Sequence, residues 1–396
     1  MKLEKRDEDM LRGKYGEAVA KAMEIIVSIA EALDSKRLLD VESVHVSGIS
    51  VSNIGRAGVE LIESFLRMGG RVQVPLATVN PIGYDVFGLL PRDAEEWGLQ
   101  LRVIKALERM GFRNILSCAP YDYGNRPRRG AHIAWAESSA VLYANSVLGA
   151  YTNREGGIIA LAAGLTGRIY EWGLHIPEER VPRVRVKIEG RLASELLGGL
   201  LGAYLGLYIE HIPLIEGGGE EAYNDEMLVK NLLAAAGAWG SHALIYLPGV
   251  TPNYTKMVNR VTATTRVSIS ELKKLLDDIG GVTNSPDVIF VGCPHLSFSM
   301  VERVLSTIEK CGSAHIPVYV ATCGCVDRSI VKHARKLNVY ILAGTCPVVT
   351  NISRWGVKSI ATNSLKAAFY LPRRHNVEVM VGSLNELITL ACTVKS

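Results

Sequence analysis

Three of the seven cysteines lie in similar surroundings along the sequence. Cys118 occurs in Ser-Cys-Ala-Pro-Tyr, Cys293 in Gly-Cys-Pro-His and Cys346 in Gly-Thr-Cys-Pro. A Cys-Pro step is found in some runs that bind iron–sulfur clusters, and proline stiffens a loop while removing a competing N–H donor. A single cysteine of this kind is most often a small buried hydrophobe. Three of them in comparable loops favour another interpretation, in which their thiolates hold a cubane cluster and leave one iron open to a substrate.

The other four cysteines are expected to lie outside such a centre. Cys323 and Cys325 form Cys-Gly-Cys, whereas zinc sites normally use Cys-x-x-Cys with a second pair, which the sequence lacks. These two could still be alternates or neighbours in the cluster site. Cys311 ends an expected helix and Cys392 lies in the last one, so both are expected in the core. Cysteines of cytosolic proteins are more often free, metal-binding or catalytic than disulfide-bonded, so disulfides are not expected.

Polar side chains gather in the sequence after the first of these cysteines. The set comprises Tyr121, Asp122, Asn125, Arg126, Glu137, Asn145, Asn153 and Arg154. Arginine side chains bind carboxylate or phosphate in a forked geometry, although a solvated basic turn explains Arg128 and Arg129 equally well. Glu137 lies in a stretch with few charges, so its carboxylate is either paired with arginine or functional. His295 either orients a ligand or is a hydrogen-bonded structural histidine.

The last third of the chain alternates between strand and helix patterns. Strands are expected at 287–291, 317–321, 338–342, 358–361 and 377–381, each followed by a helix or a reactive loop. This alternation predicts a parallel sheet with helices on its faces. Ligands bind such open sheets in the crevice at the carboxyl ends of the strands. We therefore expect Cys293, Cys346, Asn363 and Ser364, which follow strands, to converge at that edge.

The rest of the chain predicts two further parts. Expected helices cover 8–33, 53–68, 93–111 and 132–148, and expected strands cover 43–46, 71–76 and 114–116. Cys118 lies just beyond the last of these strands. The middle contains glycine-rich loops, a basic strand at 183–188 and helices near 192–208 and 225–239. The sequence thus predicts an α/β lobe at 1–150, one or two intervening lobes at 151–285 and an α/β lobe at 286–396.

Composition excludes several classes of protein. The 396 residues are 48% hydrophobic and 21% charged, with a net charge of +4, which is typical of a soluble chain with large cores. The scattered basic residues argue against nucleic-acid binding, while a mild positive bias suits a small anionic substrate. There is no secretory signal and no apolar run long enough for a bilayer, so a cytoplasmic protein is expected. Phosphate-loop, dinucleotide and His-Glu-x-x-His motifs are missing, which argues against nucleotide hydrolysis, hydride transfer and zinc hydrolysis.

Several longer blocks resemble the aconitase X family, and the resemblance covers nearly the whole chain. They are Cys118-Ala-Pro-Tyr121, Ile133-Ala-Trp-Ala-Glu-Ser138, Ala144-Asn-Ser-Val-Leu-Gly-Ala-Tyr-Thr-Asn-Arg154, Gly249-Val-Thr-Pro252, Gly292-Cys-Pro-His-Leu-Ser297 and Thr362-Asn-Ser364, followed by Lys366 and Tyr370. The family comprises dehydratases related to aconitase. The resemblance implies a multi-domain, aconitase-like α/β fold with parallel or mixed sheets flanked by helices. It also implies a small swivelling domain, here expected as a separate partner subunit because the chain stops soon after its last helix.

The resemblance implies a hydro-lyase. Archaeal two-subunit members of the family remove water from (R)-5-phosphomevalonate to give trans-anhydromevalonate 5-phosphate in the mevalonate pathway, and this is the expected reaction. Fused relatives act on cis-3-hydroxyproline, so another hydroxy-acid or hydroxyproline dehydratase is the alternative. A non-catalytic iron-sensing or RNA-binding relative of aconitase is a further alternative, which the scattered charge does not favour.

The resemblance also assigns roles to residues. Cys118, Cys293 and Cys346 would hold a [4Fe–4S] cluster. Glu137, Ser364 and Lys366 are the candidate catalytic residues, although the general base may be a serine on the small subunit. The candidate substrate-binding residues are Tyr121, Arg126, Asn145, Asn153, Arg154, His295 and Asn363.

Overall fold

The computed structural model describes residues 1–279 and 285–393, and these form two compact units. The first unit comprises Met1–Gly83 and Arg92–Val181, and the second comprises Tyr84–Pro91 and the described part of Pro182–Ser396. Both combine parallel strands with helices, which confirms the α/β class. No helix in the described parts of the chain is long and apolar enough to cross a membrane.

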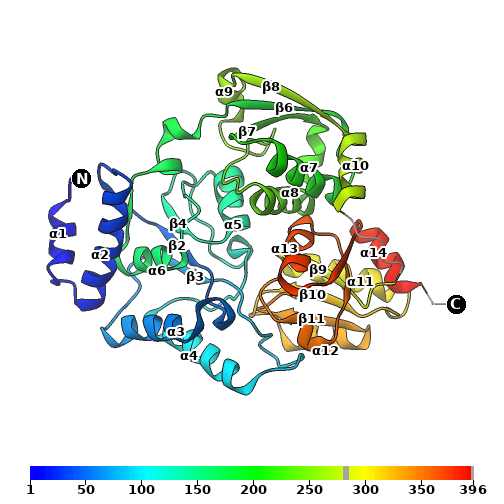
Figure 1. The fold of residues 1–396 in the computed structure, drawn as a ribbon, viewed down its shortest axis with the longest axis horizontal. Helices are drawn as coiled ribbons and strands as arrows, with labels where there is room; N and C mark the ends of the chain where they lie inside the picture. Colours follow the sequence, from blue (N-terminus) through cyan, green and yellow to red (C-terminus); the bar gives the residue numbers. More distant parts are fainter. Residues whose placement is uncertain (280–284, 394–396) are drawn as a thin grey trace. The chain divides into compact units, whose positions relative to one another are not determined.

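The first unit is built on a parallel sheet of three strands in the order β3-β2-β4. The strands are β2 (Ser43–Val46), β3 (Leu76–Val79) and β4 (Ile133–Trp135), and a small antiparallel pair is formed by β1 (Leu38–Asp40) and β5 (Arg168–Tyr170). The helices are α1 (Lys5–Leu11), α2 (Glu17–Ala32), α3 (Val51–Arg67), α4 (Ala94–Met110), α5 (Ser138–Tyr143) and α6 (Gly157–Thr166). In Figure 1, α3 and α4 lie side by side, and α6 packs against β2.

The structure differs from the expected elements of this unit at three places. The single helix expected at 8–33 is broken into α1 and α2, because Gly13 and Gly16 adopt φ angles of +78° and +99°, which only glycine adopts readily. The strand expected at 71–76 lies instead at Leu76–Val79, and 114–116 forms no strand. The helix expected at 132–148 begins with strand β4 and continues as α5 and a π-helical turn at Ala144–Leu148.

The first unit also extends past the boundary expected at residue 150. Strand β5 lies beyond that boundary, yet Arg168–Tyr170 pairs with Leu38–Asp40 of β1. The buried Arg168 guanidinium reinforces this connection, since it contacts the carboxylates of Asp7 and Asp40 at 2.8 Å each. Residues 151–181 therefore belong with the N-terminal part of the chain.

The second unit contains two parallel sheets. The larger has the order β11-β10-β9-β12-β13, formed by β9 (Val288–Leu296), β10 (Val318–Thr322), β11 (Val339–Ala343), β12 (Ser359–Thr362) and β13 (Glu378–Val381). The smaller has the order β7-β6-β8, formed by β6 (Val184–Arg191), β7 (Pro213–Gly218) and β8 (Ala263–Ser268). Its main helices are α7 (Glu195–Tyr208), α8 (Glu226–Trp239), α10 (Ile269–Ile279), α11 (Phe298–Glu309), α12 (Arg328–Lys336), α13 (Leu365–His375) and α14 (Leu384–Cys392), and α9 (Tyr254–Met257) is a single turn.

The five-stranded sheet is doubly wound. The chain runs from β9 outward through β10 to β11, then returns to the other side of β9 as β12 and β13. Helices α11, α12 and α14 contribute to the apolar core on one face, and α13 contributes to the core on the other. The strand order thus reverses between β9 and β12. This is the topological switch point, where α/β sheets of this kind bind their ligands.

Four cysteines form disulfides, contrary to the sequence-based expectation. Cys311 is bonded to Cys392 and Cys323 to Cys325. Cys311 is also exposed rather than part of the core. The first disulfide joins the residues after α11 to the end of α14 across a sequence separation of 81, for which loop-closure entropy predicts a stabilisation of about 4 kcal/mol. Cys118, Cys293 and Cys346 are free and buried.

Candidate functional site

Cys293 lies at the carboxyl end of β9, where the strand becomes irregular. The strand was expected to stop at residue 291, but it continues to Leu296 while its register against β10 shifts. Gly292 permits this, because its φ of +112° and the close approach of the Ala321 carbonyl, 2.5 Å from a would-be Cβ, exclude a side chain. The shift places Cys293 and His295 in the strand end itself, and both are buried.

Cys346 follows β11 and lies close enough to Cys293 for their charges to interact. Burial raises the pKa of the Cys346 thiol to about 12, and the charge of Cys293 raises it further. Backbone N–H groups of Val348 and Val349 and the charge of Lys366 act in the opposite direction. Without a metal both thiols remain protonated, whereas the amides and the Lys366 ammonium favour a thiolate once a metal displaces the proton.

Ser364 connects the two sides of the switch point. It follows β12, and its hydroxyl donates a hydrogen bond to the backbone carbonyl of Cys293. The same oxygen accepts the N–H of Ala367 at 3.2 Å and so caps α13. Asn363 is buried beside it, and its amide contacts the Met227 sulfur at 3.8 Å. The expected convergence of Cys293, Cys346, Asn363 and Ser364 is therefore present in the second unit.

Helix α8 supports this edge from outside the sheet. The indole N–H of Trp239 donates to the carbonyl of Leu365, the first residue of α13, at 3.0 Å. The Trp239 ring also lies edge-on against Phe369, with centroids 5.0 Å apart. The helix that carries Lys366 in its first turn is therefore held by a helix of the preceding lobe.

Cys118 occupies the corresponding edge of the sheet in the first unit. The segment before it runs along β3, because Arg113 N–H donates to the Ala77 carbonyl and Ser117 N–H to the Val79 carbonyl. Cys118 thus follows the last of these contacts at the carboxyl end of β3. Nearby in sequence, Tyr121 is buried and stacks on Tyr143 with ring centroids 3.6 Å apart.

A buried polar chain lies at the same edge and was missed by the sequence analysis. His45 of β2 contacts the Thr78 hydroxyl at 2.9 Å and the Asn80 side-chain oxygen at 3.2 Å. The Asn80 amide reaches the Glu137 carboxylate at 3.4 Å. A histidine inside the fully buried strand Ser43–Val46 was the signal that could have revealed it, since a buried imidazole needs partners.

Glu137 lies at the N-cap of α5 rather than inside a helix. Its carboxylate accepts the N–H of Ser139 at 3.3 Å and the Ser139 hydroxyl at 3.0 Å. It also exerts a charge on His45. Of the two readings left open for this carboxylate, pairing with arginine and function, the described contacts are with serine and asparagine side chains and a helix N-terminus.

Asn145 and Asn153 fasten the loop that follows the π-helical turn. The Asn145 amide donates to the Thr152 carbonyl at 2.8 Å and its oxygen accepts from the buried Arg180 guanidinium at 2.8 Å. Asn153 similarly bonds the Trp172 carbonyl at 3.0 Å and the Leu174 N–H at 2.8 Å. Arg126 and Arg154, by contrast, are exposed. Within this set, the arginine side chains are the ones open to solvent.

The candidate metal ligands are divided between the units. Cys118 belongs to the first, and Cys293 and Cys346 belong to the second. Within the described residues of either unit, no three His, Cys, Asp or Glu side chains form a group suited to a metal ion. A site with three cysteine ligands therefore needs both units.

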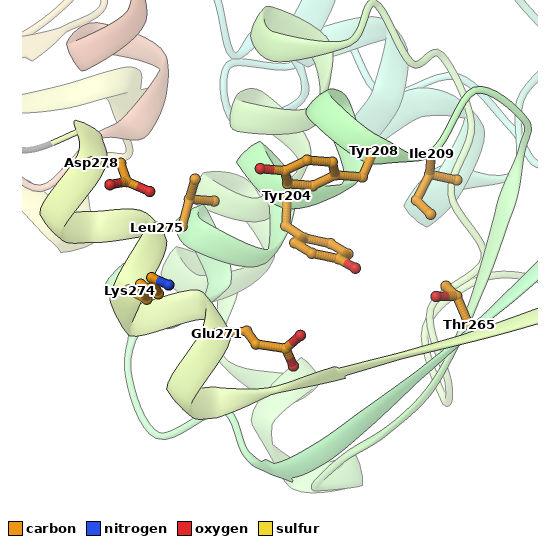
Figure 2. Close-up of a pocket in the computed structure, with 8 residues that line it drawn as sticks. All are labelled: Tyr204, Tyr208, Ile209, Thr265, Glu271, Lys274, Leu275 and Asp278. Carbon is orange, nitrogen blue, oxygen red and sulfur yellow. The ribbon is translucent and has the colours of Figure 1, made fainter.

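A separate hollow of about 510 Å³ lies in the second unit between α7 and α10. Figure 2 shows its lining of Tyr204, Tyr208, Ile209, Thr265, Glu271, Lys274, Leu275 and Asp278. None of the candidate site residues lines it. We therefore place the candidate site at the strand ends.

Models of the aconitase X family match the chain almost from end to end. The first, second and third domains of aconitase X match residues 1–178, 182–277 and 286–393, respectively. The chain therefore belongs to the aconitase X family.

Individual relatives sharpen the comparison. The chain is 37% identical over 417 residues to the phosphomevalonate dehydratase large subunit of Aeropyrum pernix, with 98% of this chain and 99% of that protein covered. The crystal structure of holo-form aconitase X from Thermococcus kodakaraensis is 34% identical, with a TM-score of 0.87 and coverage of 99% of this chain and 100% of that one. The cis-3-hydroxy-L-proline dehydratase of Hypocrea jecorina is 29% identical, and the match covers 99% of this chain but 69% of that protein.

The buried histidine of the first unit predicts a pH dependence of stability. Burial lowers the pKa of His45 to about 4, against the opposing effects of Asn80 and Glu137. Because the unfolded chain binds this proton near pH 6.5 and the folded one does not, stability is constant above that pH and falls as the pH drops towards 4. The expected loss is on the order of 3 kcal/mol. His45→Gln should show a shallower acid limb in urea unfolding, whereas exposed His211→Gln should keep the wild-type slope; equal slopes for all three proteins would contradict the assignment.

The contact between α8 and α13 predicts a local change in dynamics. Trp239→Phe keeps the ring against Phe369 but removes the hydrogen bond to Leu365, which is worth about 1 kcal/mol. We expect amides in the first turn of α13 to exchange about fivefold faster in hydrogen–deuterium exchange, with α14 unchanged. Trp172→Phe, at an exposed tryptophan of the first unit, is the matched control. Unchanged exchange in α13 would show that the indole does not hold this helix.

Proposed function

We propose that this chain is the large, catalytic subunit of a phosphomevalonate dehydratase, a hydro-lyase. The reaction removes water from (R)-5-phosphomevalonate to give trans-anhydromevalonate 5-phosphate. The observation that carries the proposal is the convergence of two buried thiols, Cys293 and Cys346, with Ser364 and Lys366 at the switch point of a doubly wound sheet. The near-complete match to a large subunit that bears this name supports the choice of substrate.

The proposed cofactor is a [4Fe–4S] cluster held by Cys118, Cys293 and Cys346. The donor set fits, because all three thiols are free and buried, and Cys346 has amide N–H groups that suit a thiolate ligand. When bound, the cluster would supply a Lewis-acidic iron for the tertiary hydroxyl of the substrate, which makes hydroxide a better leaving group. Cys323 and Cys325 are excluded from the proposed ligand set because they are bonded to each other.

The substrate is a carboxylate and a phosphate monoester, so it needs cationic and amide donors. Arg126 and Arg154 are exposed and offer forked N–H groups for these anions. Asn363, His295 and Lys366 lie at the carboxyl edge of the five-stranded sheet, where they would bind the reacting end. We assign Tyr121, Asn145 and Asn153 to the wall that orients the substrate, since each is engaged in packing or in loop hydrogen bonds.

Elimination also requires transfer of a proton from the carbon next to the carboxylate. Ser364 holds the Cys293 peptide in place, and Lys366 contributes positive charge beside Cys346. Glu137 is the candidate carboxylate for holding or moving a proton. The similar proteins are named large subunits, which implies a smaller partner subunit. We propose that this partner is a swivelling domain that supplies a serine base.

The alternative within the family is a dehydratase acting on cis-3-hydroxyproline or another hydroxy-acid. It uses the same class of reaction, so the substrate must be tested directly. Anaerobic reconstitution with the small subunit, followed by iron and sulfide analysis, should load the wild type. The loaded enzyme should dehydrate phosphomevalonate. Activity with hydroxyproline alone would overturn the substrate and leave the reaction class intact.

Serine substitutions separate the proposed ligands from the other cysteines. Cys118→Ser, Cys293→Ser and Cys346→Ser should each lower bound iron and abolish the visible absorption of the cluster, because a thiolate ligand is lost. Cys325→Ser is the control and should load as fully as wild type. Full loading of any of the first three variants would remove that residue from the ligand set.

The proposed role of Glu137 can be tested without disturbing the fold. Glu137→Gln keeps the acceptor for Ser139 but removes the charge, so kcat should fall by about 10²–10⁴ while iron loading stays normal. Glu171→Gln is the matched control, because Glu171 forms a surface ion pair with Arg37 in the same unit. A kcat within twofold of wild type would exclude Glu137 from proton transfer.

A further inference from the structure

The Cys323–Cys325 disulfide lies at the end of the strand between those of the two cysteines just discussed. Strand β10 is hydrogen-bonded to β9 on one side and to β11 on the other. Cys293 lies at the end of β9, Cys346 follows β11, and Cys323 directly follows β10. The Cys-Gly-Cys sequence is therefore part of the same carboxyl edge.

The two sulfurs of this pair differ in access to solvent. Cys323 is fully buried, whereas Cys325 is exposed. An incoming thiol can therefore reach the outer residue. The Cys325 backbone N–H lies 3.2 Å from the Cys323 sulfur, so the inner sulfur has a donor that stabilises it when it leaves as a thiolate.

The Cys311–Cys392 disulfide provides an internal comparison. Its sequence separation is 81, against 2 for Cys323–Cys325. A disulfide that closes a long loop stabilises the fold substantially, and by linkage the fold protects that disulfide from reduction to the same extent. A disulfide across a single glycine closes a very small loop, so it contributes little to stability and receives little protection. Cys311 is also exposed, so access alone does not distinguish the pairs.

We propose that Cys323 and Cys325 form a thiol–disulfide exchange site that opens and closes in the folded protein by reaction with small thiols or dithiols. A thiolate attacks the Cys325 sulfur, the Cys323–Cys325 bond breaks and Cys323 leaves as a thiolate. The second thiol then attacks the mixed disulfide and releases Cys325. Two electrons and two protons pass to the protein, and the reductant leaves as its own disulfide. The state of this pair decides whether the sheet edge carries two or four thiols.

The test uses the purified full chain under native conditions. The protein is titrated anaerobically with dithiothreitol, quenched with acid, and its newly formed thiols are alkylated after unfolding and located by peptide mass spectrometry. We expect Cys323 and Cys325 to be reduced at a reductant concentration about tenfold or more below that for Cys311 and Cys392. The melting temperature should stay unchanged while only the first pair is open. Oxidised glutathione should then close it again.

Variants keep the outcome interpretable. Cys325→Ser should retain the wild-type melting temperature and leave Cys323 as a free thiol, whereas the double substitution of Cys311 and Cys392 by serine should lower the melting temperature. Simultaneous opening of both pairs, or a fall in melting temperature when the Cys323–Cys325 pair opens, would overturn the proposal. The readout is a thiol count, so the result is independent of whether the dehydratase assignment holds.

Discussion

The hydrogen bond from the Ser364 hydroxyl to the Cys293 carbonyl is the contact on which the candidate site depends. It crosses from β12 to β9 at the one place where the strand order of the large sheet reverses. Gly292 has already taken the chain out of regular register there, so the Cys293 carbonyl needs an acceptor-satisfying partner from outside the strand ladder. Ser364 provides this partner and at the same time caps α13, so a single side chain fixes both the thiol-bearing strand end and the first turn that carries Lys366.

The units also show why the site was predictable in part. Strand-end placement follows from local patterns: alternating strands and helices imply parallel sheets, and parallel sheets bring their carboxyl ends to one edge. That reasoning found Cys293, Cys346, Asn363 and Ser364 correctly as a group. It could not find the chain from His45 through Asn80 to Glu137, because those residues come from three strands or strand ends and are joined only by tertiary hydrogen bonds.

The errors have equally physical causes. The alanine-rich stretch at 132–148 has strong helix propensity, yet Ile133–Trp135 pairs in parallel with β2, because burial in the sheet outweighs propensity. Gly13 and Gly16 end one helix and begin another at left-handed φ values that hydrophobic periodicity alone does not reveal. The disulfides were missed because the pairing of Cys311 with Cys392 needs α11 and α14 to pack on the same face of one sheet, which is a property of the fold. The thiol of Cys346 illustrates the converse, since its raised pKa arises from burial that only the assembled sheet provides.

The π-helical turn at Ala144–Leu148 has a consequence for how this protein can vary. Such a turn accommodates one residue more than an α-helical turn over the same rise, and each residue of a helix rotates the following chain by about 100°. Losing one residue here would restore ordinary helix but swing the succeeding loop around the helix axis and separate the Asn145 amide from Thr152. Segment length is thus constrained more strongly here than side-chain identity, and insertions or deletions should be tolerated least in this turn.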